Sequence, residues 1–262
     1  MSLPADAPID RMAAACRSDG RILGLLLYGS RAAGTSDAHS DIDFGVVVAD
    51  AALADVVADR DSLVRAVGEA LFLEDFGNPS NIHVILADGA AFELIVRPIG
   101  ELVDDGPHRI LLDTDGSLAR ALTVQRAREP QVASAEDVRK QILYFWHEVE
   151  HVATAIGREQ LLWAHGGLEE MRAICLRLAR AAAGADAEDD EPYWKVDGLL
   201  YQGLRERLLT TIVPAQSADM RRAAGELLAV YRSLARPLAE QHGLPYPQRL
   251  DDLVSARLAA VA

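Results

Sequence analysis

The sequence predicts an α+β protein in which a small mixed-sheet domain is followed by an all-α helical bundle domain. Apolar runs typical of strands lie in the first half of the 262 residues. The second half carries long segments with helical spacing and no strand signals. The run Glu-Pro-Gln at 129–131 separates the two halves, so the expected domains are 1–130 and 131–262.

Helix and strand patterns alternate in the first half. In chain order the spacing predicts a helix at 9–19, a strand at 22–28, a turn with a short helix at 30–36, a strand at 42–48 and a helix at 52–71. The β-type runs 82–86 and 92–96 flank a polar turn, which predicts a hairpin. Together these elements predict a small α/β unit with a mixed sheet.

Helical periodicity continues through the second half. The predicted helices are 135–158, 160–183, 196–211 and 217–241. Pro237 is expected to kink or end the last of them, because proline lacks the backbone N–H and clashes with the preceding turn. Four helices joined in this way predict a bundle.

The chain is acidic, with a formal net charge of −14 and an isoelectric point near 4.9. A protein that binds nucleic acid normally presents a basic face, because neutralising phosphates supplies much of the affinity. The composition therefore argues against a nucleic-acid partner and suits a cationic small substrate, with solubility alone as the plain alternative.

Cysteine use and hydropathy bear on the compartment. Cys16 and Cys175 stand far apart, which argues against a disulfide framework and fits a reducing cytoplasm. The N-terminal residues lack the pattern of a signal peptide, and no apolar run approaches the length of a membrane span. We therefore expect a cytoplasmic protein with no membrane partner.

The segment 28–48 carries the strongest chemical signal. An apolar run ends in Gly29-Ser30, and Asp41 and Asp43 follow at the start of the next apolar run. Residues two apart in a strand point to the same face, so the two carboxylates are expected to project side by side. Such oxygen ligands suit Mg²⁺, and the backbone of the Gly-Ser turn can approach a phosphate at a helix N-terminus. A phosphate cradle beside a metal clamp is the apparatus of phosphoryl or nucleotidyl transfer.

Glu93 is the best candidate for a third carboxylate. It is a charged residue in the otherwise apolar run 92–96. Two-metal sites usually need more than two carboxylates, which favours a functional role. The alternative is an exposed strand residue on a solvated face.

These residues resemble the signature of the DNA polymerase β-type nucleotidyltransferase superfamily. The matching parts are Gly-Ser-Arg at 29–31, Ser-Asp-Ile-Asp at 40–43 and the later acidic strand residue Glu93, and the resemblance covers roughly residues 22–97. The layout of a small catalytic domain followed by a helical bundle is similar to that of antibiotic nucleotidyltransferases, which include aminoglycoside adenylyltransferases and lincosamide nucleotidyltransferases.

The resemblance implies an enzyme with two Mg²⁺ ions and a nucleoside triphosphate co-substrate, ATP. It implies transfer of AMP to a hydroxyl of a small-molecule acceptor. We expect the acceptor to bind between the domains, because ligand sites favour such interfaces. The residues it assigns to the nucleotide are Gly29, Ser30, Arg31 and Ser40, and those it assigns to metal binding and catalysis are Asp41, Asp43 and Glu93.

Several points stay open at this stage. Arg31 either assists the phosphates or packs the turn. The general base is Glu93 or a carboxylate of the helical half such as Glu148 or Glu169. The acceptor, the nucleotide base and the choice between monomer and homodimer are not readable from the sequence.

Two other function classes compete with this interpretation. One is a nucleotide-binding or partner-binding module, degenerate or protein-modifying in the manner of an antitoxin. The other is a zinc metallopeptidase, because the run His147-Glu148-Val149-Glu150-His151 matches the H-E-x-x-H pattern. Thr154 replaces the glycine of the extended peptidase pattern and no third ligand motif follows, which argues against a peptidase. The alternatives for the two histidines are a structural or exposed pair and a role in the acceptor cleft.

Overall fold

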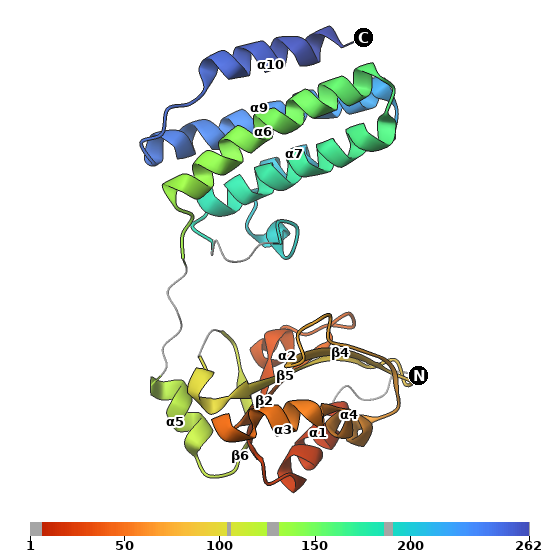
Figure 1. The fold of residues 1–262 in the computed structure, drawn as a ribbon, viewed down its shortest axis with the longest axis vertical. Coiled ribbons are helices and arrows are strands. Elements are labelled where there is room, and N and C mark those ends of the chain that lie inside the picture. The colour runs from red at the N-terminus through yellow and green to blue at the C-terminus, as the bar shows by residue number, and fades with distance from the viewer. Residues whose placement is uncertain (1–6, 104–105, 125–130, 186–190, 262) are drawn as a thin grey trace. The chain divides into compact units, whose positions relative to one another are not determined.

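The protein divides into two compact units, Met1–Arg128 and Glu129–Ala262. The computed structural model describes residues 7–103, 106–124, 131–185 and 191–261 (Figure 1). Residues 129 and 130 of the expected domain boundary lie outside these ranges, and the division into 1–130 and 131–262 stays a prediction.

The first unit is built on one six-stranded mixed sheet with the strand order β3-β4-β5-β2-β1-β6. Its strands are β1 (Ile22–Tyr28), β2 (Ile42–Val48), β3 (Ala70–Glu74), β4 (Asn81–Leu86), β5 (Ala91–Pro98) and β6 (Arg109–Asp113). Its helices are α1 (Ala7–Ser18), α2 (Gly29–Ala33), α3 (Leu53–Ala58), α4 (Arg60–Val67) and α5 (Ser117–Val124), with short 3₁₀ turns at Asp50–Ala52 and Ile99–Glu101. Strands β2 and β5 pair in parallel and the other neighbours are antiparallel, which confirms the predicted mixed sheet.

Both faces of this sheet carry apolar side chains. On one face, α1, α3 and α4 bury residues such as Met12 and Val64 against strand residues such as Phe44 (Figure 1). On the other face, Leu118 of α5 packs with Leu26 in a smaller core. The smaller core lies over β1 and β2, so along β5 only every second residue is buried, because successive strand residues point to opposite faces.

The strands predicted at 22–28 and 42–48 are confirmed as β1 and β2, and the predicted hairpin is confirmed as β4 and β5. The single helix predicted at 52–71 is wrong. Helical structure ends at Val67, and Gly68 leads into the edge strand β3. Gly68 lies against β4, where an added Cβ would come within 3.1 Å of a Leu86 methyl group.

The second unit is a helical bundle. Its helices are α6 (Ala135–Gly157), α7 (Leu161–Ala182), α8 (Gln202–Leu209), α9 (Ser217–Gln241) and α10 (Gln248–Ala260), with a 3₁₀ turn at Val196–Gly198. Helix α6 begins with a capping box, in which Ser134 and Asp137 each satisfy the backbone N–H of the other. In the core the rings of Phe145 and Tyr231 stack with centroids 3.8 Å apart, and the Tyr231 hydroxyl donates a hydrogen bond to the Ile142 carbonyl.

The helices predicted at 135–158, 160–183 and 217–241 are confirmed as α6, α7 and α9. The helix predicted at 196–211 is wrong as one element, because only Gln202–Leu209 is α-helical. Helix α9 runs through Pro237 to Gln241, so that proline does not end it. Helix α10 has no counterpart among the predicted elements.

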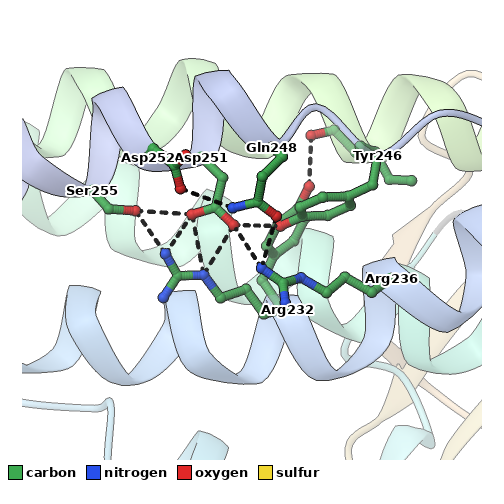
Figure 2. Close-up of polar contacts among 9 residues, drawn as sticks. Arg232, Arg236, Tyr246, Gln248, Asp251, Asp252 and Ser255 are labelled. Atoms are coloured by element: carbon green, nitrogen blue, oxygen red, sulfur yellow. Dashed lines mark hydrogen bonds and ion pairs between the residues drawn. The ribbon is translucent and has the colours of Figure 1, made fainter.

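A buried carboxylate fixes α10 on α9. Asp251 is fully buried and accepts hydrogen bonds from Arg232 of α9, from Tyr246 at 2.9 Å and from Ser255 at 3.0 Å (Figure 2). Arg236 of α9 lies 3.3 Å from the same carboxylate. Two arginines therefore balance the one buried charge, as a buried ion requires.

Among the described helices, none combines the length and the apolar composition that crossing a bilayer requires.

Candidate active site

A row of polar side chains crosses the sheet at right angles to its strands. Asp43 of β2 is in register with Tyr28 of β1 on one side and with Glu93 of β5 on the other. Glu93 is in turn opposite His83 of β4, which is opposite Glu74 of β3. Laterally paired residues point to the same face, and adjacent strands lie about 4.8 Å apart. The sheet therefore brings Asp43 and Glu93 together as nearest neighbours.

Gly29 closes the site beside Asp43. It follows β1 directly, opens α2 and has a φ of 64°, a left-handed conformation that favours glycine. A Cβ added at this position would lie 2.1 Å from Oδ2 of Asp43. The glycine therefore serves two needs, the sharp turn from strand to helix and the close approach of the backbone to a carboxylate.

Arg31 ties the two sequence motifs to each other. Its guanidinium donates hydrogen bonds to the carbonyl of Asp41 at 2.7 Å and to that of Ser40 at 3.0 Å. The Ser40 hydroxyl, for its part, accepts from the backbone N–H of Asp37 at 2.9 Å. These contacts give Arg31 and Ser40 a role in holding the loop before β2. Asp41 is exposed and directly precedes that strand.

The loop before β2 is stabilised by its own carboxylate. The backbone N–H of His39 and the hydroxyl of Ser40 both donate to Asp37, and they hold the pKa of that carboxyl below its ordinary value. An ionised Asp37 thus fixes the turn that presents Asp41.

Glu93 is half-buried and held in place by its neighbours on β4. Asn81 donates a hydrogen bond to Oε1 of Glu93 at 2.6 Å, and Nε2 of His83 lies 3.9 Å from the same oxygen. Glu93 is therefore a positioned carboxylate and not a freely solvated strand residue. Neither Asn81 nor His83 was predicted, although the hairpin held the signal: strands folded back around Asp88 place residue 83 opposite residue 93.

A second glycine shapes the floor of the site. Gly45 lies two residues after Asp43 on β2, and a Cβ there would come within 2.4 Å of the Tyr28 ring. The absence of a side chain lets that ring lie over the strand. The guanidinium of Arg97 lies 6.0 Å from the centroid of the Tyr28 ring.

The carboxylates of the first unit fit a divalent metal by the chemistry of their donors. Asp41, Asp43 and Glu93 offer the oxygen ligands that Mg²⁺ prefers, and the absence of a side chain at Gly29 lets the Asp43 carboxylate lie against the backbone there. Their oxygen atoms do not all lie within 4.8 Å of one another. Three like charges repel each other, so the carboxylates are expected to stand apart when no cation lies between them.

Two carboxylates of the helical unit were expected as alternative bases, and their surroundings differ. Glu169 is ion-paired to the buried Arg172 at 2.5 Å and accepts a hydrogen bond from Tyr193 at 3.0 Å. Burial alone raises the pKa of Glu169, but these partners outweigh it and lower the pKa. A carboxylate held in this way is a weak base.

Glu148, in contrast, is buried on α6 between two histidines of the H-E-x-x-H run, His147 and His151. It has no arginine or lysine partner among the contacts that the structure describes for it.

The chain is similar to known proteins along nearly its whole length. The sequence model of the streptomycin adenylyltransferase family matches residues 6–261. Among solved structures, an aminoglycoside 6-adenyltransferase from Bacillus subtilis is similar at 16% identity and a TM-score of 0.48, covering 99% of this chain and 98% of that one. A nucleotidyltransferase-like protein from Exiguobacterium sibiricum is similar at 9% identity and a TM-score of 0.39, covering 87% and 74%. A search of curated proteins gave no match.

Proposed function

Because the chain belongs to the streptomycin adenylyltransferase family, we propose that it transfers AMP from ATP to a hydroxyl group of a cationic small molecule such as an aminoglycoside antibiotic. Membership makes the protein a nucleotidyltransferase and implies a nucleoside triphosphate and a divalent metal ion. The choice of ATP, of two Mg²⁺ ions and of the acceptor class belongs to the proposal.

One observation carries the assignment of the site. Asp43 and Glu93 are neighbours in register on parallel strands, and Gly29 lies against Asp43 with no room for a side chain. Two carboxylates on neighbouring central strands and a glycine-led turn beside them would supply metal ligands and a phosphate cradle at the same place.

The proposed roles follow from these positions. Asp41, Asp43 and Glu93 would hold the metal ions, which supply electrostatic stabilisation of the attacking and leaving oxygens when bound. Gly29 and Ser30 would receive the β- and γ-phosphates through the backbone of the turn. The acceptor oxygen forms a bond to the α-phosphorus while the bond to pyrophosphate breaks, and the hydroxyl proton passes to a carboxylate.

The carboxylate that takes this proton is Glu93, which Asn81 positions through a hydrogen bond. Glu169 is the weaker candidate, because its ion pair with Arg172 lowers its pKa.

The overall charge supports a cationic acceptor. At a net charge of −14 the protein attracts polycations over several ångströms, and aminoglycosides carry several amines. A lincosamide, with one amine, would gain less from this field.

The test is magnesium-dependent release of pyrophosphate from ATP with a panel of aminoglycosides and lincosamides. Asp43→Asn should lower the rate more than about 100-fold, because it removes one charge from the metal clamp without changing its shape. Asp88→Asn is the matched control, since Asp88 lies in the β4–β5 turn outside the polar row, and it should keep the wild-type rate.

Retained activity in Asp43→Asn would refute the site. If none of the aminoglycosides or lincosamides causes release of pyrophosphate, the proposed small-molecule acceptor is refuted. ATP binding without any release would favour a module that has lost catalysis.

A further inference from the structure

One group of side chains in the helical unit has the composition of a transition-metal site. His147, Glu148 and His151 of α6 each offer a ligand atom, and these three atoms all lie within 4.8 Å of one another. The two imidazole rings are adjacent, with centroids 4.0 Å apart. Within the described ranges no other three such residues meet this distance.

The carboxylate of this group has no lysine or arginine partner among its described contacts. Glu148 is only 7% exposed, its hydrogen-bonding partner Tyr144 is uncharged, and the nearest basic atom described for it is Nδ1 of His151 at 3.9 Å. A buried carboxylate normally has a partner of opposite charge, because its desolvation is otherwise uncompensated. A divalent ion bound to the same oxygens would supply that charge.

The neighbouring helix packs closely against this group. Gly167 of α7 faces Val152 and Glu148, and a Cβ there would come within 2.5 Å of the valine and 3.8 Å of the carboxylate. The ring of Trp163, also on α7, lies 5.6 Å from that of His151 and flanks the group.

We propose that His147, Glu148 and His151 form a binding site for one Zn²⁺ ion, separate from the carboxylates of the first unit. Histidines at i and i+4 share one face of a helix, so both can ligate the same ion. Two imidazoles and one carboxylate are a known zinc ligand set, and they leave one coordination position open. Imidazole ligands favour zinc over magnesium, whereas Asp41, Asp43 and Glu93 offer oxygen only.

The test is a zinc titration of the metal-free full-length protein against a chromophoric chelator, in excess Mg²⁺ to occupy oxygen-only sites. The wild type should bind one equivalent of Zn²⁺. His147→Asn and His151→Asn should each weaken that binding more than about 100-fold, because each removes a ligand. His147 is exposed, so its replacement leaves the bundle core intact, and far-UV circular dichroism checks this.

Two control variants make the result specific. His242→Asn removes an imidazole beyond the end of α9, and Asp43→Asn alters the other candidate metal site. Both should bind zinc as the wild type does. The proposal is overturned if the wild type binds zinc no more tightly than His147→Asn, or if Asp43→Asn loses the ion while the histidine variants keep it. The titration measures the ion alone, so its outcome does not depend on nucleotide transfer.

Discussion

Gly29 and Asp43 act as one unit although fourteen positions separate them in the sequence. Gly29→Ala should lower the transfer rate about 100-fold, because the added methyl group displaces the Asp43 carboxylate by the order of an ångström. It also forces alanine into a left-handed conformation, at a cost of about 1 to 2 kcal/mol. Steady-state kinetics and thermal unfolding measure the two effects separately.

Gly34→Ala is the control that separates contact from strain. Gly34 has a φ of 73°, close to that of Gly29, but nothing lies within 4 Å of where its Cβ would be. This variant should lose a similar amount of stability and keep its activity. Equal loss of activity in both variants would mean that strain in the turn, and not the contact with Asp43, is responsible.

Glu93 and Glu74 offer a second matched pair, because they lie in the same polar row. Glu93→Gln should reduce the rate about 100-fold or more, the range seen when a positioned acid or base is removed. Glu74→Gln, on the exposed edge strand, should have little effect. Comparable rates for the two variants would show that Glu93 is a surface strand residue with no part in catalysis.

At this scale the sequence predicted the residues that lie close to one another along the chain. Gly29, Asp41 and Asp43 flank consecutive strands, so their spacing alone suggested a site. The partners of Glu93 were missed because Asn81 and His83 reach it through cross-strand pairing, which depends on register. The position of a residue within its strand is easier to predict from sequence than the residue that it pairs with on the neighbouring strand.

Among the elements, α10 depends most clearly on a single side chain. Asp251→Asn should destabilise the bundle by about 3 kcal/mol, because it leaves Arg232 and Arg236 without their shared anion. Urea unfolding followed by circular dichroism measures this. Asp252→Asn is the control at the next position, where the side chain is exposed and contacts only Gln248 among the described hydrogen bonds.

The same network sets a dependence on pH. Burial raises the pKa of Asp251, but hydrogen bonds from Arg232, Tyr246 and Ser255 outweigh this and lower it below the ordinary value. A lowered pKa means that the contribution to stability is complete above the ordinary carboxyl pKa and is lost as the pH falls through the lowered one. The stability difference between wild type and Asp251→Asn should therefore shrink in strong acid, and a constant difference would contradict the role of the charge.

The elements that were missed share a physical reason. The sequence of β3, Ala-Leu-Phe-Leu-Glu, contains good helix formers, and only its pairing with β4 makes it a strand. The helix α9 continues through Pro237 because tertiary packing of Ala235, Leu238 and Ala239 holds it on both sides. Local propensity is a weak guide wherever such long-range contacts decide.

The molecule as a whole contains separate hydrophobic cores. The buried residues of the bundle core run from Val138 to Leu258, and those of the two sheet cores from Ile9 to Leu122. A segment with a core of its own can fold alone. The segment 131–262 should therefore keep its helical circular dichroism and unfold cooperatively.

A shorter segment, 131–246, tests whether that stability includes α10. It lacks Asp251, Val254 and Leu258, so it should unfold at lower denaturant concentration than 131–262. A segment 131–262 that is unstructured by itself would show that the bundle needs the first unit to fold.

The polar row has a consequence for how the sheet assembles. If β5 paired with β2 one residue out of register, Glu93 would turn toward the apolar face and Leu94 would take its place beside Asp43. An ionised carboxylate among α1, α3 and α4 would be strongly unfavourable. The acidic residues proposed for catalysis thus also favour the correct register of the strands. A sheet that paired out of register would lose the site, and burial of Glu93 would make that sheet unstable.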